Sequence, residues 1–187
     1  MARRQQIEVV QMVSEQLILG NVFSFGAAVC LAVSVMKKSK KSLIGWQIGD
    51  TVLCVVANLI LLSYSATVIS AICVVRNVLS YLNKLNATLT VILLLTGTII
   101  GLWANNRGVI GWLPVIASAE YTVCMYLFKS AQGMRYALIV NLFMWLVHDA
   151  YIQSYPMAGM DLALSVWTTW QTFKNRRSNQ IKPRARK

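Results

Sequence analysis

Apolar runs long enough to cross a bilayer alternate with short polar segments along almost the whole chain. A helix rises about 1.5 Å per residue, and the hydrocarbon core of a membrane is roughly 30 Å thick. Seven runs meet this requirement: Leu17–Met36, Leu43–Leu62, Ala66–Leu82, Leu85–Trp103, Val109–Phe128, Arg135–Ile152 and Met157–Phe173. The pattern predicts an all-α, polytopic membrane protein with seven transmembrane helices and short connections.

Composition supports this prediction and removes several other function classes. The 187 residues are 57% hydrophobic and 13% charged, which is too apolar for a soluble domain of this length. The net charge of +12 does not indicate nucleic-acid binding, because the basic residues lie between and after apolar spans and not on one folded face. No cofactor or metal is expected, since the four cysteines lie inside spans without ligand spacing. They are Cys30, Cys54, Cys73 and Cys124.

The basic residues are distributed unequally between the two faces of the predicted seven-span bundle. One face receives 14 of them: Lys37, Lys38, Lys40, Lys41, Lys84, Lys129, Arg135, Lys174, Arg176, Arg177, Lys182, Arg184, Arg186 and Lys187. The opposite face receives Arg3, Arg4 and Arg107. The positive-inside rule then places the N-terminus outside and the C-terminus in the cytoplasm. We expect the basic clusters to contact anionic lipid headgroups, with a specific partner site as the alternative.

An internal repeat appears when the chain is shifted by 91 positions, which superposes the first three spans on the last three. Matching pairs include Gly20 with Gly111, Ser39 with Ser130, Asp50 with Asn141, Asn58 with Asp149, and Ser63 with Ser154. Three spans are an odd number, so the fourth span restores a parallel orientation. The predicted division is a first half at 17–83, a linker helix at 84–106, a second half at 107–173 and a basic tail at 174–187, all in one membrane domain. We refer to this layout as 3+1+3.

The layout resembles the SWEET, PQ-loop and PnuC group of transporters and the KDEL-receptor relatives. Local strings are more similar to the YgjV-like family of bacterial inner-membrane proteins. These strings are Arg76 in its span, "LPVI" at Leu113–Ile116, "MR" at Met134-Arg135, and "WLVHD" with Trp145, Val147 and His148. The resemblance covers nearly the whole chain and implies an inner-membrane location, without naming a substrate. The Pro-Gln pair of PQ-loop proteins is absent here, which puts their hinge in doubt.

Four polar residues occur at a similar depth in four spans, about 10 Å inside the cytoplasmic interface. They are Asp50, Arg76, Glu120 and Asn141. A charge at this depth costs on the order of 3 kcal/mol unless it faces the bundle interior and finds a partner. We therefore expect Arg76 to pair with an acid, either as a structural brace or as part of a cavity for a polar substrate. Asn77 joins these candidates, because an asparagine of the third span contacts substrate in the transporters that the chain resembles.

A second polar group lies nearer the outside and consists of His148, Asp149 and Asp161. We expect water to reach it through an outer mouth, so that His148 changes charge with external pH. The structural alternative is a satisfied buried histidine. No catalytic residue is assigned, because the sequence has no Ser/His/Asp spacing, H-E-x-x-H motif or glycine-rich phosphate loop.

These observations favour a facilitator or transporter of a small polar metabolite that is not an enzyme. A receptor or assembly factor without transport activity is the alternative, because KDEL-receptor relatives use this architecture for binding alone. An intramembrane enzyme is the third reading and rests only on His148, Asp149 and Asp161. The ligand is an unidentified small polar molecule, and self-association into a homo-oligomer is left open.

Overall fold

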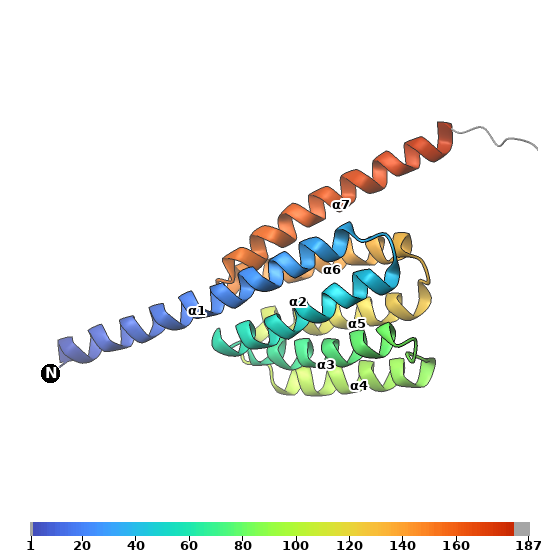
Figure 1. Cartoon of the computed structure of the whole chain (residues 1–187). Helices are drawn as coiled ribbons and strands as arrows, with labels where there is room; N and C mark the ends of the chain where they lie inside the picture. Colours follow the sequence, from blue (N-terminus) through green and yellow to red (C-terminus); the bar gives the residue numbers. More distant parts are fainter. Residues whose placement is uncertain (1, 182–187) are drawn as a thin grey trace, which may run out of the picture.

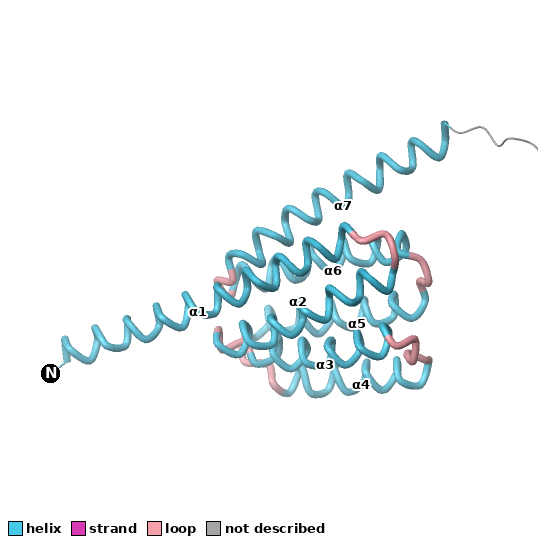
Figure 2. Tube along the Cα trace, viewed as in Figure 1, coloured by secondary structure: helices cyan, strands magenta, loops and turns pink. Residues whose placement is uncertain are grey.

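A computed structural model describes the backbone of residues 2–181 and the side chains of residues 13–130 and 133–170. The chain forms α1 (Ala2–Met36), α2 (Lys40–Ile60), α3 (Tyr64–Tyr81), α4 (Ala87–Trp103), the short 3-10 helix η1 (Gly108–Gly111), α5 (Trp112–Leu127), α6 (Ala131–Tyr151) and α7 (Tyr155–Ile181). No strand occurs in the described backbone, so the all-α prediction is confirmed (Figures 1 and 2). The α7 helix continues past the predicted span end at Phe173, and the basic side chains of the predicted tail lie outside the described residues.

Four segments are long and apolar enough to cross a membrane within the described part of the chain. They are Val13–Met36, Lys40–Ile60, Tyr64–Tyr81 and Gly108–Leu127, and Ala87–Trp103 is a shorter apolar helix. Polar and apolar residues are placed opposite to those of a soluble protein. Ile99 of α4 is 66% exposed, whereas Asp50 and Arg76 are buried. A surface of this kind requires lipid around it.

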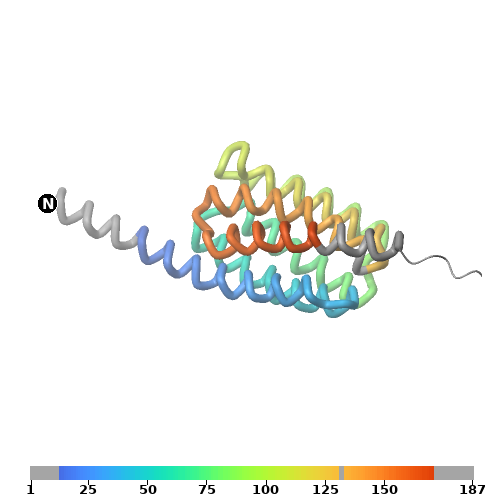
Figure 3. Tube along the Cα trace, turned by 90° about the horizontal axis from the view of Figure 1, so that it is seen from above, coloured from blue at the N-terminus to red at the C-terminus, as the bar shows by residue number. Residues whose placement is uncertain are grey.

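Six of the seven α-helices form a closed ring, and α4 packs outside it. Around the ring, contacts join α1 to α2, α2 to α3, α3 to α5, α5 to α6, α6 to α7, and α7 back to α1. We call α1–α3 the first trio and α5–α7 the second trio. Each ring contact has an equivalent in the other trio, and the helices run roughly alongside one another in the turned view (Figure 3).

The α4 helix is seated on the seam between α3 and α5, where glycine allows close approach. A Cβ atom at Gly101 would lie 2.8 Å from Ile69 Cδ1 and 2.9 Å from Val115 Cγ2, closer than side-chain atoms pack. The buried positions of α4 are Thr90, Gly97 and Gly101. This helix therefore covers one seam of the ring and sends no large side chain into it.

The two turns that join α2 to α3 and α6 to α7 have the same backbone hydrogen bonds, 91 residues apart. Leu62 N–H donates to Leu59 O and Ser63 N–H to Asn58 O; Gln153 N–H and Ser154 N–H donate to Ala150 O and Asp149 O. This pattern is a Schellman motif, and its left-handed residue has φ of 55° at Leu62 and 63° at Gln153. The register predicted from the sequence repeat therefore holds at these turns.

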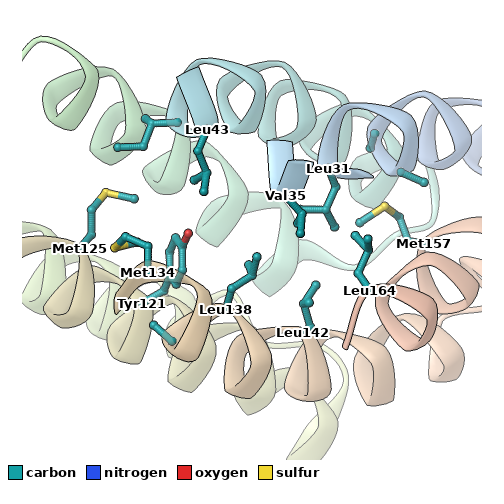
Figure 4. Packing of buried hydrophobic residues seen from close by; sticks show 14 residues of the cluster. Leu31, Val35, Leu43, Tyr121, Met125, Met134, Leu138, Leu142, Met157 and Leu164 are labelled. Atoms are coloured by element: carbon teal, nitrogen blue, oxygen red, sulfur yellow. The ribbon is translucent and has the colours of Figure 1, made fainter. Parts of the chain in front are cut away.

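The ends of the bundle differ in chemistry. We call the end with loops 37–39, 82–86 and 128–130 the lysine end, and the end with loops 61–63, 104–107 and 152–154 the asparagine end. A large apolar cluster also packs between the trios and extends from Met125 and Met134 near the lysine end to Met157 at the start of α7. In Figure 4, Leu31 and Val35 of α1 lie opposite Leu138 and Leu142 of α6. The ring is thus sealed by apolar packing around a more polar middle.

Candidate functional site

A cavity of about 70 Å³ lies inside the ring, with walls from both trios. Its polar lining residues are Gln47, Asp50, Thr51, Ser70, Asn77, Tyr121, Asn141 and Asp161. A space of this size admits a few water molecules or a small polar solute. Polar groups of the predicted inner layer and of the predicted outer group therefore share one small chamber.

The two carboxylates of the cavity come from different trios. Asp50 projects from α2 and its Oδ1 accepts a hydrogen bond from the Cys54 thiol at 3.6 Å. Asp161 projects from α7, is 1% exposed, and neither of its oxygens has a hydrogen-bond partner. We predicted Asp161 in a water-reached outer group with His148; it instead faces the same cavity as Asp50.

Arg76 does not form the predicted ion pair with an acid. Its Nε and Nη2 donate to Asn77 Oδ1 at 3.2 and 3.1 Å, and its Nη1 donates to Thr122 Oγ1 at 3.2 Å. The guanidinium also stands 5.0 Å from the ring centre of Tyr121, in cation–π geometry. Within the described residues no carboxylate forms an ion pair with it. Arg76 shares the depth of Asp50 but points to α5, because depth along a helix does not fix the direction of a side chain.

The remaining members of the predicted inner layer divide between the cavity and its surroundings. Asn77 and Asn141 line the cavity, and Asn141 Nδ2 donates to Ala117 O at 2.8 Å. Glu120 is half-buried on α5, accepts a hydrogen bond from the Cys124 thiol at 3.3 Å, and is not part of the lining. The layer predicted from depth therefore contributes three of its five candidates to the cavity wall.

His148 is wholly buried and links the two trios. Its Nε2 lies 3.0 Å from Ser63 Oγ at the start of α3, and its Nδ1 lies 2.9 Å from Asp149 Oδ1. Asp149 is 4% exposed, so this group is shielded from water in this conformation, and its contact with external water through an open outer mouth stays a prediction. The arrangement has the hydrogen-bond order of a Ser-His-Asp triad, which the sequence spacing did not indicate.

Two asparagines tie the turns at the asparagine end to the opposite trio or to its leading loop. Asn21 Nδ2 donates to Gln153 O at 3.2 Å, and its Oδ1 accepts from Tyr155 N–H at 3.0 Å. Asn106 Nδ2 donates to Leu62 O at 2.8 Å, and its Oδ1 accepts from Tyr64 N–H at 3.2 Å. The bound positions are again 91 residues apart, so each Schellman turn is held by the same amide clamp.

Cations hold the trios together at the lysine end. Lys40 at the start of α2 donates from Nζ to Met125 O at 2.9 Å and to Phe128 O at 3.0 Å, at the C-terminal end of α5. Arg135 of α6 donates from Nη2 to Lys37 O at 3.3 Å, just after α1. Both contacts place a positive charge on the carbonyls that a helix end leaves without partners.

The family comparison agrees with the membrane location that the sequence implied. Residues 18–179 match the model of Imp-YgjV, described as a bacterial inner membrane protein. The chain belongs to this family. Neither the curated proteins nor the solved structures contain a match. Membership in Imp-YgjV confirms the resemblance drawn from Arg76 and the "WLVHD" string, whereas likeness to the SWEET group rests on the sequence pattern alone.

Several site residues of this Imp-YgjV member were missed in the sequence. Gln47 and Tyr121 face the cavity and are joined by a hydrogen bond from Gln47 Nε2 to the Tyr121 hydroxyl at 2.8 Å. Ser70 lines it as well, and the repeat could have found it, because Ser70 lies 91 positions before Asp161. Ser63 carried no signal as a partner of His148, since that contact depends on how the trios meet.

Proposed function

We propose that this protein is a transporter or facilitator that moves a small polar solute through the cavity between two parallel three-helix halves, in the 3+1+3 layout. The observation that supports the proposal is the polar cavity itself, because residues at equivalent positions of the two trios line it. Asp50 and Asn141 are one such pair, and Ser70 and Asp161 are another. A site shared by two repeated units is the usual design of transporters built from parallel repeats.

Contacts at the two ends of the bundle support an alternating mechanism. The asparagine clamps and the Ser24–Ser154 hydroxyl pair, 2.8 Å apart, join the trios at one end. Lys40 and Arg135 join them at the other end. Opening either set while the other holds would expose the cavity to one side of the membrane at a time. A solute larger than the present cavity would enter by such an opening.

A flux measurement tests the proposal. The purified protein is reconstituted into vesicles that contain an isotope-labelled extract of bacterial small molecules, and mass spectrometry records which compounds leave. Ser70→Phe fills the cavity and should stop the efflux, whereas Ile99→Phe on the 66% exposed face of α4 should not. If no compound leaves faster with the wild type than with Ser70→Phe, transport is excluded for that extract.

A reversible lock sharpens the same test. The double variant Ser24→Cys with Ser154→Cys should form a disulfide on oxidation, because the wild-type hydroxyl oxygens are 2.8 Å apart. Efflux should fall after oxidation and return after reduction, while each single variant remains active throughout. Efflux that continues at the wild-type rate through the oxidised double variant would contradict opening at the asparagine end.

We propose a structural role for the Ser63–His148–Asp149 chain and no enzymatic activity. Ser63 and His148 are both 0% exposed and neither lines the cavity, so no substrate carbonyl could reach the hydroxyl. A fluorophosphonate probe, which labels activated serines, should leave Ser63 unmodified in detergent and in vesicles. Labelling that His148→Ala removes would instead favour the intramembrane enzyme.

The proposed orientation has the lysine end in the cytoplasm, where its cations meet anionic headgroups, and the N-terminus outside. Reporter tags at the two termini test it directly. The N-terminal tag should report the external side and the C-terminal tag the cytoplasm. Both tags on one side would exclude seven membrane crossings and, with them, the parallel arrangement of the two halves.

A further inference from the structure

The cavity contains two acidic side chains and no cationic one. Asp50 and Asp161 are its two acidic lining residues, and no lysine, arginine or histidine lines it among the described residues. The buried lining atoms without a partner are Gln47 Oε1 and the two carboxylate oxygens of Asp161. All three are acceptors. An acceptor buried without a partner is costly, and a buried charge more so.

The nearby positive groups are engaged elsewhere. Arg76 donates to Asn77, Thr122 and the Ser118 carbonyl, and its guanidinium faces the Tyr121 ring. His148 is held between Ser63 and Asp149. Neither side chain is among the cavity-lining residues. Neither Arg76 nor His148 is therefore placed to balance a negative charge on Asp50 or Asp161 in the cavity.

We propose that the cavity binds a small monovalent cation, an alkali metal ion or a primary ammonium group, between Asp50 and Asp161. The volume of about 70 Å³ admits a cation of only a few heavy atoms. Oxygens of Gln47 and Asn141 supply further ligands, and the indole of Trp145, also in the wall, suits an ammonium group. A divalent ion is disfavoured, because no cluster of three or more metal-ligating side chains occurs in the described part of the chain.

The positions of the two carboxylates determine what a bound cation would do to the two trios. Asp50 belongs to α2 of the first trio and Asp161 to α7 of the second, so a bound cation joins the trios across the cavity. The inference rests on the proposed function, because it assigns a ligand to the same cavity. Binding of the cation would favour the closed conformation described here, and its loss would favour opening.

Thermal unfolding of the purified protein in detergent tests the proposal. Choline chloride is replaced, at constant ionic strength, by the chloride of sodium, potassium, ammonium, methylammonium or magnesium. At least one monovalent cation should raise Tm with concentration, because a ligand that binds only the native state stabilises it. Comparison of the alkali and ammonium salts identifies the source. A response to magnesium alone, or to none of the salts, would overturn the proposal.

Three variants assign the response to the cavity. Asp50→Asn and Asp161→Asn should each weaken the apparent affinity at least about tenfold, which corresponds to loss of one charge contact. Glu120→Gln is the matched control, since this carboxyl is half-buried outside the lining, and should bind as the wild type does. Asp161→Ser, which copies Ser70, is a second variant for the case that Asp161→Asn does not fold. An unchanged cation response in the Asp161 variants would refute the site.

The outcome separates this inference from transport. Cation binding without efflux from vesicles would leave the site in place and exclude transport of the compounds in that extract. Efflux of uncharged compounds, with no cation response and no effect of Asp161→Asn, would support transport and overturn the cation site.

Discussion

The α2–α3 pair and the α6–α7 pair have the same backbone and different chemistry. In the first pair, Asn58 Nδ2 donates to Ser70 Oγ at 3.3 Å, and the residue before Asn58 is Ala57. In the second pair, the equivalent positions are Asp149, Asp161 and His148. The three neutral side chains of Ala57, Asn58 and Ser70 are thus replaced by a histidine and two acids. The repeat preserves the turn and its clamp, and it concentrates ionisable groups in the second trio.

This difference shows which part of the second trio is needed for folding and which is available for function. A neutral pair is sufficient to join two helices at these positions, as Asn58 and Ser70 do. The acids of the second trio are more expensive to bury than an amide and a hydroxyl. We infer that Asp161 serves the cavity and not the helix pairing, whereas Asp149 holds His148 in the buried chain with Ser63, and the following substitutions examine this.

The largest effect is expected from His148→Ala. The substitution leaves Asp149 buried without its partner at 2.9 Å and removes the contact to Ser63, so the free energy of unfolding should fall by about 4 kcal/mol. Chemical unfolding in mixed micelles measures it. Adding Asp149→Asn recreates the Ala57-Asn58 pair of the first trio and supplies a donor for Asp161, so most of the loss should be recovered. A double variant no more stable than His148→Ala would show that the two pairs are not interchangeable.

Arg76→Ala should lower the free energy of unfolding by a smaller amount, about 2.5 kcal/mol, because several hydrogen bonds made by a buried charged group disappear. Its equivalent in the second trio, Trp167, is 45% exposed on the outer face of α7. Trp167→Ala should therefore change stability by less than about 0.5 kcal/mol. The charge exchange of Asp50→Arg with Arg76→Asp should not rescue folding, because these residues form no ion pair. Recovery of folding in the protein with both substitutions would support an ion pair between Asp50 and Arg76.

The clamps at the asparagine end should contribute equally if the two turns are true equivalents. Asn21→Ala and Asn106→Ala each remove two hydrogen bonds to the backbone at their turn, for an expected loss of about 1 kcal/mol apiece, and Asn21→Ala also removes the bond to Leu17 O within α1. The clamps share no residues, so the double variant should lose the sum of the two. Unequal losses beyond measurement error would show that only one clamp holds the end closed.

The smallest effect concerns the left-handed residues of the turns. Leu62 and Gln153 have φ of 55° and 63°, which glycine adopts without a Cβ penalty. Leu62→Gly and Gln153→Gly should each raise the free energy of unfolding by about 0.5 kcal/mol, less than the removed strain because glycine also loses more entropy on folding. Asn83→Gly should change less, since asparagine tolerates this conformation. A loss of stability in Gln153→Gly would mean that its side chain matters more than its backbone.

The fold was accessible from the sequence because hydrophobic length and repeat register are properties of the chain itself. The apolar runs located all seven α-helices, and the shift of 91 positions correctly paired the turns at Ser63 and Ser154. The helix ends were less well placed. Lys40 belongs to α2, although the predicted span starts at Leu43, because Ser39 caps the helix earlier by accepting from Ser42 N–H.

The sequence could assign each candidate site residue a level along its helix, but it could not predict the direction in which the side chain points. Each residue along a helix rises about 1.5 Å and turns by about 100°, so the count of residues fixes the level well and the direction only relative to its own helix. Asp50 and Arg76 were therefore assigned to one level, but the ion pair predicted between them does not occur among the described residues. Asp161 was assigned to the level of His148, yet its side chain lines the same cavity as Asp50. The rotation of each helix depends on packing between the trios, which one sequence does not display.

Because α4 lies outside the ring, we infer that it matters for biogenesis mainly through the membrane crossing that it adds, and less through its contacts with the ring. No α4 residue lines the cavity, and the buried positions of α4 are two glycines and a threonine. In the proposed seven-span topology, one added crossing decides the side from which α5 enters the bilayer during insertion. Without it, α5–α7 would insert in the opposite sense, and the loop with Lys129, proposed to be cytoplasmic, would be carried across the membrane. A helix that contributes almost nothing to the chamber thereby sets the direction of half of its walls.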